Sequence, residues 1–168
     1  EEREARSPGA AQKSSANAND LRGAILRVKP KPDGGYTIPA GNLFKPGTKG
    51  TRPEIFVMGT RNSFRLGVDP KNGYVYWGDV GPDARFPNPN YGPAGFDEIN
   101  QARTAGFYGW PYFVGANKAY REFDYAADKA APAYDVNKPI NNSPNNTGIK
   151  ELPPAQPAFI AYPHGFST

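Results

Sequence analysis

Residues typical of β-strands are concentrated between residues 54 and 103, in four short runs separated by turns. The runs read EIFVMGT, FRLGVDP, GYVYWGDV and FDEINQA. β-branched and aromatic residues of this kind favour strands, and the sequence DPKNG at residues 69–73, between the second and third runs, is typical of a hairpin turn. We therefore predict that residues 54–103 form one four-stranded antiparallel sheet.

Further strands are expected on both sides of this sheet. Residues 24–28 alternate in type before a Lys-Pro stop, and residues 157–163 read PAFIAYP. We expect strands within residues 21–29 and 158–162 to pair outside the sheet of residues 54–103. A single sheet of this size would expose two edges and an apolar face, so it requires neighbours.

A radial repeat of such sheets is a β-propeller. The predicted fold class is therefore all-β, a portion of a β-propeller with one complete four-stranded blade, flanking strands and long loops. Propellers close with about 4 to 8 blades of about 40 to 50 residues each. A chain of 168 residues that holds one recognisable blade is therefore expected to be part of a longer protein.

The remaining segments have no regular period. Residues 1–20 are predicted to be an irregular N-terminal segment, and residues 21–168 a partial propeller in which residues 54–103 are the complete blade. Residues 111–157, rich in Asn and Pro, are predicted to be a long irregular insert. Glycine and proline supply 19 residues each, which argues against a helical bundle.

Charge and composition exclude several classes of function. The formal net charge is +4, without the clustered Lys and Arg face of a nucleic-acid-binding protein, so no nucleic-acid partner is expected. No apolar stretch approaches the roughly 18 residues of a membrane span, so no membrane insertion is expected. The chain has no cysteine, which excludes disulfides, thiolate metal ligands and cysteine nucleophiles.

Five short motifs occur in a fixed order between residues 59 and 111. They are Gly59-Thr60-Arg61-Asn62, Asp69-Pro70, Gly78-Asp79-Val80-Gly81-Pro82-Asp83, Asp97-Glu98-Ile99-Asn100 and Tyr108-Gly109-Trp110-Pro111. Together they resemble the soluble quinoprotein glucose and sorbosone dehydrogenases over roughly residues 21–114. The amino-acid sequence outside these five motifs is more similar to the sorbosone-type branch of the family, which is found in large bacterial proteins.

This resemblance implies a six-bladed β-propeller that uses pyrroloquinoline quinone (PQQ) and calcium. It implies oxidation of a sugar hydroxyl or hemiacetal, transfer of the electrons to an external acceptor, and a periplasmic or secreted location. The remainder of the propeller would be supplied by other parts of the parent protein, and the 168-residue chain alone is expected to be inactive.

Arg61 and Asn62 are the candidate quinone-binding residues. A guanidinium meets carboxylate oxygens in pairs, and PQQ carries three carboxylates. The Asn62 amide can both donate and accept hydrogen bonds, which suits the edge of the same cofactor that carries carbonyl and amide groups. Without the resemblance, both residues would be interpreted as part of a turn that follows a strand.

Gly81 and Pro82 are the candidate cofactor and calcium residues. Calcium takes 6–8 oxygen ligands, some of them backbone carbonyls. In the enzymes that the chain resembles, this Gly-Pro pair donates carbonyls to the calcium that also holds PQQ. Asp79 and Asp83 flank the turn and could bind calcium, although exposed turn aspartates are commoner.

No catalytic residue is assigned. Asp97 and Glu98 are neighbours on a strand and should point to opposite faces, so we expect one to anchor a turn and the other to face solvent. His164 is the single histidine and could be a general base, but the resemblance implies that the base comes from an earlier blade. Trp110 is interpreted as a core aromatic, with sugar stacking as the alternative.

Two other interpretations stay open. The chain could belong to a propeller that serves as a non-catalytic binding or scaffold module, which Ser63 favours because the family usually has proline after Arg-Asn. It could also be an independent small β domain, which would unfold cooperatively on its own.

Overall fold

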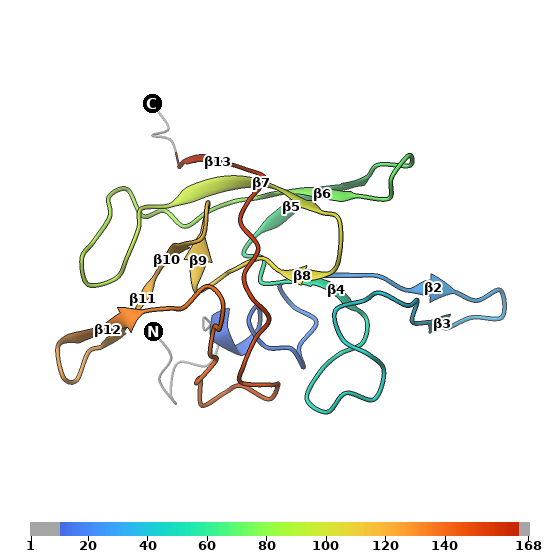
Figure 1. Ribbon diagram of the computed structural model, residues 1–168, viewed down its shortest axis with the longest axis horizontal. Coiled ribbons are helices and arrows are strands. Elements are labelled where there is room, and N and C mark those ends of the chain that lie inside the picture. The colour runs from blue at the N-terminus through green and yellow to red at the C-terminus, as the bar shows by residue number, and fades with distance from the viewer. Residues whose placement is uncertain (1–10, 165–168) are drawn as a thin grey trace.

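The structure is a computed structural model that describes residues 11–164 (Figure 1). It is built almost entirely of short strands and turns. Apart from one turn of 3₁₀ helix, η2 (Ala11–Lys13), the elements are β1 (Ala24–Leu26), β2 (Lys29–Pro30), β3 (Tyr36–Thr37), β4 (Ile55–Met58), β5 (Ser63–Val68), β6 (Val75–Asp79), β7 (Phe96–Ala102), β8 (Gly106–Phe107), β9 (Phe113–Val114), β10 (Lys118–Ala119), β11 (Arg121–Asp124), β12 (Lys129–Ala133) and β13 (Ile160–Pro163).

The largest sheet has four antiparallel strands in the order β13-β7-β6-β5, and it forms the upper layer in Figure 1. Its central strand β6 alternates in burial, with Val75, Trp77 and Asp79 buried and the two residues between them half-buried. Trp77 lies opposite Asn100 of β7, and Asp79 lies opposite Glu98. One face of this sheet therefore covers the interior and carries acidic groups at one end.

The predicted membership of the four-stranded sheet is wrong at its first strand. All four runs of residues 54–103 form strands, but β4 lies in a second sheet, between β1 and β8, with order β1-β4-β8. The four residues of β4 are all buried, as expected for a strand covered on both faces, and β4 pairs in parallel with β8. The chain cannot turn back as a hairpin after β4 because the N–H groups of Gly59 and Thr60 donate to the carbonyls of Ser15 and Gly23.

The predicted place of the last strand is also wrong. β13 does not pair elsewhere but takes the outer position beside β7, with Ile160 opposite Ile99. Backbone hydrogen bonds hold both ends of this strand, from Ala158 to Gly115 and from His164 to Gly95. The fourth strand of this sheet therefore comes from a segment that begins about sixty residues after the end of β7.

The irregular segments are more ordered than predicted. Residues 15–18 at the N-terminal side are buried, and the side-chain amide of Asn141 donates to the carbonyls of Gln12 and Ala16. The stretch 111–157, expected to be irregular, contains two short hairpins, β9–β10 and β11–β12. Residues 1–10 of the predicted N-terminal segment lie outside the described residues.

Two clusters of buried side chains form the interior. One joins the N-terminal segment, β4, β8 and β9, and includes Ile55, Phe107 and Tyr112. The other lies beneath the four-stranded sheet around Trp77 and Val57, where Tyr108 packs edge-on against Trp77 with ring centroids 4.8 Å apart. Segments that are distant in sequence therefore meet below the blade.

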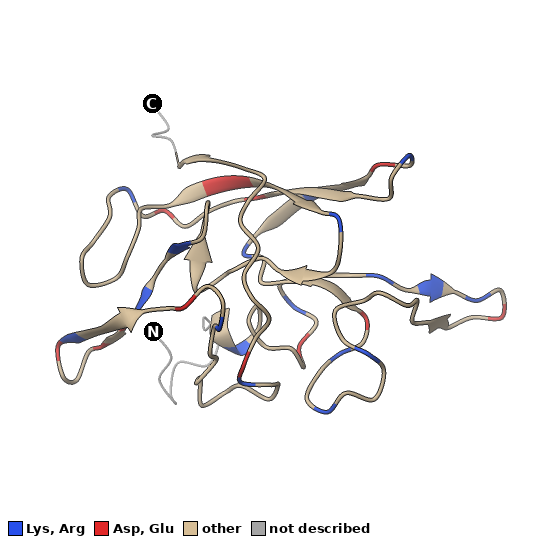
Figure 2. Ribbon diagram, viewed as in Figure 1, with Lys and Arg blue, Asp and Glu red and all other residues tan. Residues whose placement is uncertain are grey.

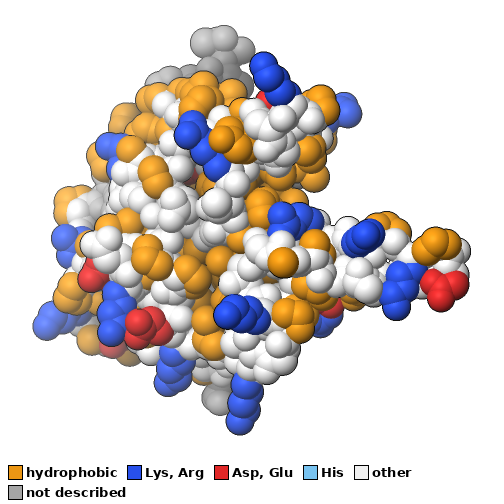
Figure 3. Space-filling view, turned by 45° about the vertical axis from the view of Figure 1, so that its right-hand side comes forward, with side chains coloured by type: hydrophobic (Ala, Val, Ile, Leu, Met, Phe, Trp, Pro, Cys, Tyr) orange, Lys and Arg blue, Asp and Glu red, His pale blue; other side chains and the backbone are white. Residues whose placement is uncertain are grey.

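The far face of the four-stranded sheet is apolar and exposed. Phe64, Ile99, Ile160 and Tyr162 are 64%, 40%, 48% and 49% exposed, and hydrophobic side chains gather at the top of the view in Figure 3. The sheets are open, and an uncovered apolar face is what a propeller blade presents to its neighbour. Lys and Arg positions and Asp and Glu positions are both spread along the ribbon in Figure 2.

Candidate functional site

The turn that carries Arg61 and Asn62 is fixed by a buried carboxylate. Asp79, at the end of β6, is 8% exposed, and its two oxygens accept the backbone N–H groups of Arg61 at 3.0 Å and Asn62 at 2.6 Å. Burial raises the pKa of Asp79, and these two N–H groups oppose the shift. The aspartate is therefore a structural anchor of the turn.

The Arg61 side chain is exposed but held in place. Its Nη1 donates to the carbonyl of Val80 at 2.8 Å, and the guanidinium carbon lies 5.5 Å from the centre of the Trp110 ring. A guanidinium has five N–H groups in a rigid fork, so one backbone bond leaves donors for an anion. The neighbouring Asn62 is also exposed, and its backbone carbonyl accepts the Val80 N–H.

The Gly81-Pro82 loop presses against the start of β7. The Gly81 N–H donates to Asp97 Oδ1 at 2.8 Å, and a Cβ atom at Gly81 would lie 2.0 Å from the carbonyl oxygen of Phe96. Only glycine fits this position. The Pro82 carbonyl accepts the Ala84 N–H at 2.7 Å and lies against Gly95, where a Cβ would come within 1.8 Å of it.

Asp97 and Glu98 point to opposite faces of β7, as predicted. Asp97 anchors the Gly81 turn, but the expectation that its neighbour faces solvent is wrong. Glu98 is half-buried, where Oε1 accepts the Gly115 N–H at 2.6 Å and Oε2 accepts the Asn100 amide at 2.9 Å. Burial raises the pKa of Glu98, in spite of these hydrogen bonds. Both carboxylates therefore hold backbone in place.

His164 joins the same cluster, which the sequence did not indicate. Its Nδ1 lies 3.0 Å from Asp97 Oδ1, and its Nε2 lies 3.1 Å from Asp83 Oδ1. The hydrogen bond to Asp97 raises the pKa of His164, and the Asp97 charge acts in the same direction. The three residues are distant in sequence and meet because β13 pairs with β7, so no local motif could have identified the cluster.

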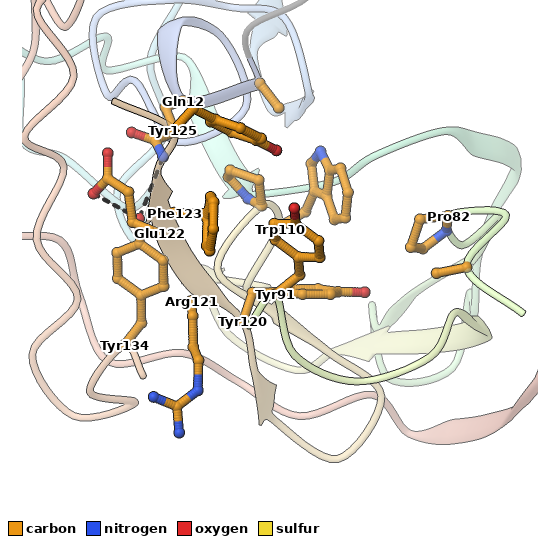
Figure 4. A pocket seen from close by; sticks show the side chains of 13 residues that line it. Gln12, Pro82, Tyr91, Trp110, Tyr120, Arg121, Glu122, Phe123, Tyr125 and Tyr134 are labelled. Atoms are coloured by element: carbon orange, nitrogen blue, oxygen red, sulfur yellow. Dashed lines mark hydrogen bonds between the residues drawn. The ribbon is translucent and has the colours of Figure 1, made fainter. Parts of the chain in front are cut away.

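Two hollows lie on either side of the Trp110 and Pro82 side chains. A small one of about 10 Å³ is bordered by Arg61, Gly81 and Glu98, and a larger cleft of about 380 Å³ opens on the other side. The cleft is shown in Figure 4. Trp110, interpreted from sequence as a core aromatic, is half-buried and lines both.

The donor groups differ in how well they fit PQQ and calcium. The exposed, oriented guanidinium of Arg61 fits an anionic cofactor. Within residues 11–164, no group of three or more His, Cys, Asp or Glu side chains is arranged to hold a metal ion. The Pro82 carbonyl is already bonded to Ala84, although a carbonyl oxygen has a second lone pair.

Comparison with known proteins identifies the class. Residues 4–146 match a family model described as glucose/sorbosone dehydrogenase, and the chain belongs to this family. Together with the all-β architecture and open sheets, the match confirms the predicted fold class, a portion of a β-propeller.

Individual relatives are distant and much longer. The HIPL2 protein of Arabidopsis thaliana is 31% identical over 83 residues, which is 49% of this chain and 10% of that protein. A crystal structure of a glucose dehydrogenase covers 88% of the chain at 20% identity with a TM-score of 0.49. A putative oxidoreductase (glucose dehydrogenase) from Thermus thermophilus covers 74% at 29% identity with a TM-score of 0.41. The chain spans 32% of the length of each of these two structures.

Proposed function

We propose that this chain contributes part of the quinone and calcium site of a PQQ-dependent sugar dehydrogenase of the aldose or sorbosone type. The observation that carries the proposal is the Arg61 guanidinium, which is exposed, fixed by the Val80 carbonyl, and set beside Trp110. Family membership supplies the sugar dehydrogenase class.

Each residue has a role that follows from its chemistry. Arg61 binds a carboxylate of the cofactor through charge-assisted hydrogen bonds, and the Asn62 amide donates or accepts at its edge. Gly81 and Pro82 direct backbone carbonyls towards calcium, with Gly81 fixed by its N–H bond to Asp97. When bound, PQQ supplies a quinone that accepts the electrons of sugar oxidation and passes them to an external acceptor.

The described residues act in binding and positioning. We assign no general base among them, because Asp97, Glu98 and His164 are engaged in holding the Gly81 loop and the strand ends. The base and the other half of the cofactor site belong, in this proposal, to the remainder of the propeller.

We also propose a periplasmic or secreted location. Within residues 11–164, no helix combines the length and apolar character that crossing a membrane requires. The location itself is inferred from the family.

Quinone titration tests the proposal without measuring turnover. The intact protein, freed of cofactor, is titrated with PQQ in excess calcium, and binding is followed by the optical change of the quinone. Replacing Arg61 with alanine should weaken binding by about 1.5–3 kcal/mol, the range for a hydrogen bond to a charged group. Arg103→Ala is the matched control, since Arg103 is exposed at the other end of β7.

Equal affinity of the wild type and the Arg61→Ala variant would remove Arg61 from the site. Failure of the intact protein to bind PQQ at all would favour the alternative function, a non-catalytic binding or scaffold module. Ser63, at the first position of β5 directly after Arg61-Asn62, is the observation that favours this alternative.

A further inference from the structure

The larger cleft has the size and lining of a small-molecule site. Its volume of about 380 Å³ falls within the range of about 300–1,000 Å³ found for ligand pockets. Six aromatic side chains line it: Tyr91, Trp110, Tyr120, Phe123, Tyr125 and Tyr134. They come from the loop after β6, from the segment around β9 and β10, and from the β11–β12 hairpin with the residue that follows it. Figure 4 shows these side chains around one opening, with Pro82 at its far side.

Three of these rings form an exposed aromatic platform. The Phe123 ring packs edge-on against Tyr91 and Tyr125, with centroids 5.0 Å and 4.9 Å apart. Tyr91 and Tyr125 are nevertheless 41% and 46% exposed. Aromatic rings that stabilise one another and still face solvent are suited to contact with a ligand.

The platform is held in position by backbone. The Arg121 N–H donates to the Tyr91 carbonyl at 2.9 Å, which joins the loop to the hairpin, and Asn88 closes a tight turn by accepting the Gly92 N–H at 2.7 Å. Gly92 lies so close to Tyr120 that a Cβ atom there would be 2.9 Å from the Tyr120 Cα. The rings from the two segments are therefore arranged before a ligand arrives.

Polar groups stand at the edge of the rings. The Tyr134 hydroxyl donates to Glu122 Oε2 at 3.3 Å and accepts from the Gln12 amide at 3.3 Å. Arg121 provides a positive charge beside the negative charge of Glu122, so the cleft has no net charge of either sign. This combination favours a neutral ligand with many hydroxyl groups over an anion or a cation.

We propose that this cleft binds a pyranose ring of an oligosaccharide. A pyranose has an apolar C–H face, which fits Tyr91 and Phe123, and hydroxyl edges, which fit Glu122 and Gln12. The cleft shares Trp110 and Pro82 with the hollow beside Arg61. The inference rests on the proposed function in one respect, the link between the cleft and oxidation. If the end of a sugar chain is oxidised near Arg61, the next ring of that chain would lie in this cleft.

Equilibrium binding without PQQ tests the cleft separately from oxidation. The intact protein is titrated calorimetrically with cellotriose, maltotriose and xylotriose, and then with the same sugars after the change Tyr91→Ala or Phe123→Ala. We expect saturable binding of at least one trisaccharide and a weakening of about tenfold in each variant, which corresponds to about 1.4 kcal/mol for the lost ring contact. Phe64→Ala, which removes an exposed ring on the far side of the four-stranded sheet, is the matched control and should bind like the wild type.

Glu122→Gln is a milder second variant that keeps the shape of the side chain and removes the charged acceptor. It should also weaken binding, which keeps the test valid if a ring replacement disturbs the hairpin. The cleft assignment would be overturned if none of the three trisaccharides bound saturably. It would also be overturned if the Tyr91→Ala, Phe123→Ala and Glu122→Gln variants all bound with the affinity of the wild type. Because the titration contains no quinone, a protein that binds trisaccharides here but never PQQ would refute the proposed function and leave the cleft assignment standing.

Discussion

The Nδ1 atom of His164 lies 3.0 Å from the Oδ1 atom of Asp97. The same oxygen accepts the Gly81 N–H at 2.8 Å, so one carboxylate joins the end of β13 to the loop that carries the candidate calcium carbonyls. His164 and Asp97 are 67 residues apart in sequence, and the Gly81 loop meets both of them at this one oxygen atom.

The first prediction concerns Asp97. Asp97→Ala should lower the free energy of unfolding by about 1–3 kcal/mol, because it leaves the Gly81 N–H without its acceptor in a half-buried position. Asp97→Asn keeps an amide oxygen in place and should cost less, and it should leave quinone affinity nearly intact. Urea unfolding and quinone titration measure the two effects.

Asp83 provides the matched comparison for Asp97. It contacts the other ring nitrogen of His164, but its side chain is 86% exposed, and exposed pairs of this kind contribute about 0–1 kcal/mol. If Asp83→Ala destabilised the protein as much as Asp97→Ala, the anchoring role of Asp97 would be wrong.

The second prediction tests the close approach at Gly81. Gly81→Ala should destabilise the protein by at least about 1–3 kcal/mol, because the added methyl group would overlap the Phe96 carbonyl. Gly67→Ala is the control, since a Cβ at Gly67 would have no heavy atom within 4 Å and neither glycine has a positive φ. Denaturant midpoints that shift equally for the two variants would contradict the loop geometry.

The third prediction is a dependence of stability on pH that arises far from the candidate site. The side chain of Arg52 donates a hydrogen bond to Glu54 and lowers the pKa of that carboxyl below its ordinary value of 4.5, and the Tyr36 hydroxyl contributes in the same direction. Because the folded-state pKa is the lower one, the stabilisation is present above pH 4.5 and is lost as the pH falls through the folded-state pKa.

Glu54→Gln should therefore flatten the acid side of the stability profile and lower stability near neutral pH. Urea midpoints measured for wild type and variant across the acid range check this outcome. Parallel profiles for the two proteins would show that Glu54 has the same pKa in the folded and unfolded states.

The positions of the strands were predictable from the sequence, whereas their pairing was not. Residues 55–58, 63–68, 75–79 and 96–102 are strands, as their β-rich runs indicated. The run at 55–58 has apolar residues at every position rather than in alternation, which signals a strand covered on both faces. Because residues 55–58 and 63–68 are close in sequence, a hairpin between them was predicted. Instead, the N–H groups of Gly59 and Thr60 bind the carbonyls of Ser15 and Gly23, and β4 pairs in the other sheet.

The candidate site was predictable in the same limited way. The sequence placed Arg61 and Asn62 in one turn and Gly81 and Pro82 in another, and the structure brings the two turns together through Asp79. No sequence pattern indicated the place of His164, because its contact with Asp97 depends on the pairing of β13 with β7. The aromatic cleft was missed for a similar reason, since Tyr91 and Phe123 come from segments without a periodic pattern.

The last prediction is that the 168-residue chain, produced on its own with PQQ and calcium, oxidises no sugar. Turnover needs a base within about 2.6–3.2 Å of the reacting hydroxyl, and a cofactor held by groups from several directions. The described residues offer Arg61, Asn62 and the Gly81-Pro82 carbonyls, while His164 is held between Asp83 and Asp97. Dye-linked turnover with glucose, sorbosone and other aldoses is the measurement. Sustained dye reduction that disappears in a His164→Ala variant would show that this histidine leaves its two carboxylate partners to act as the base.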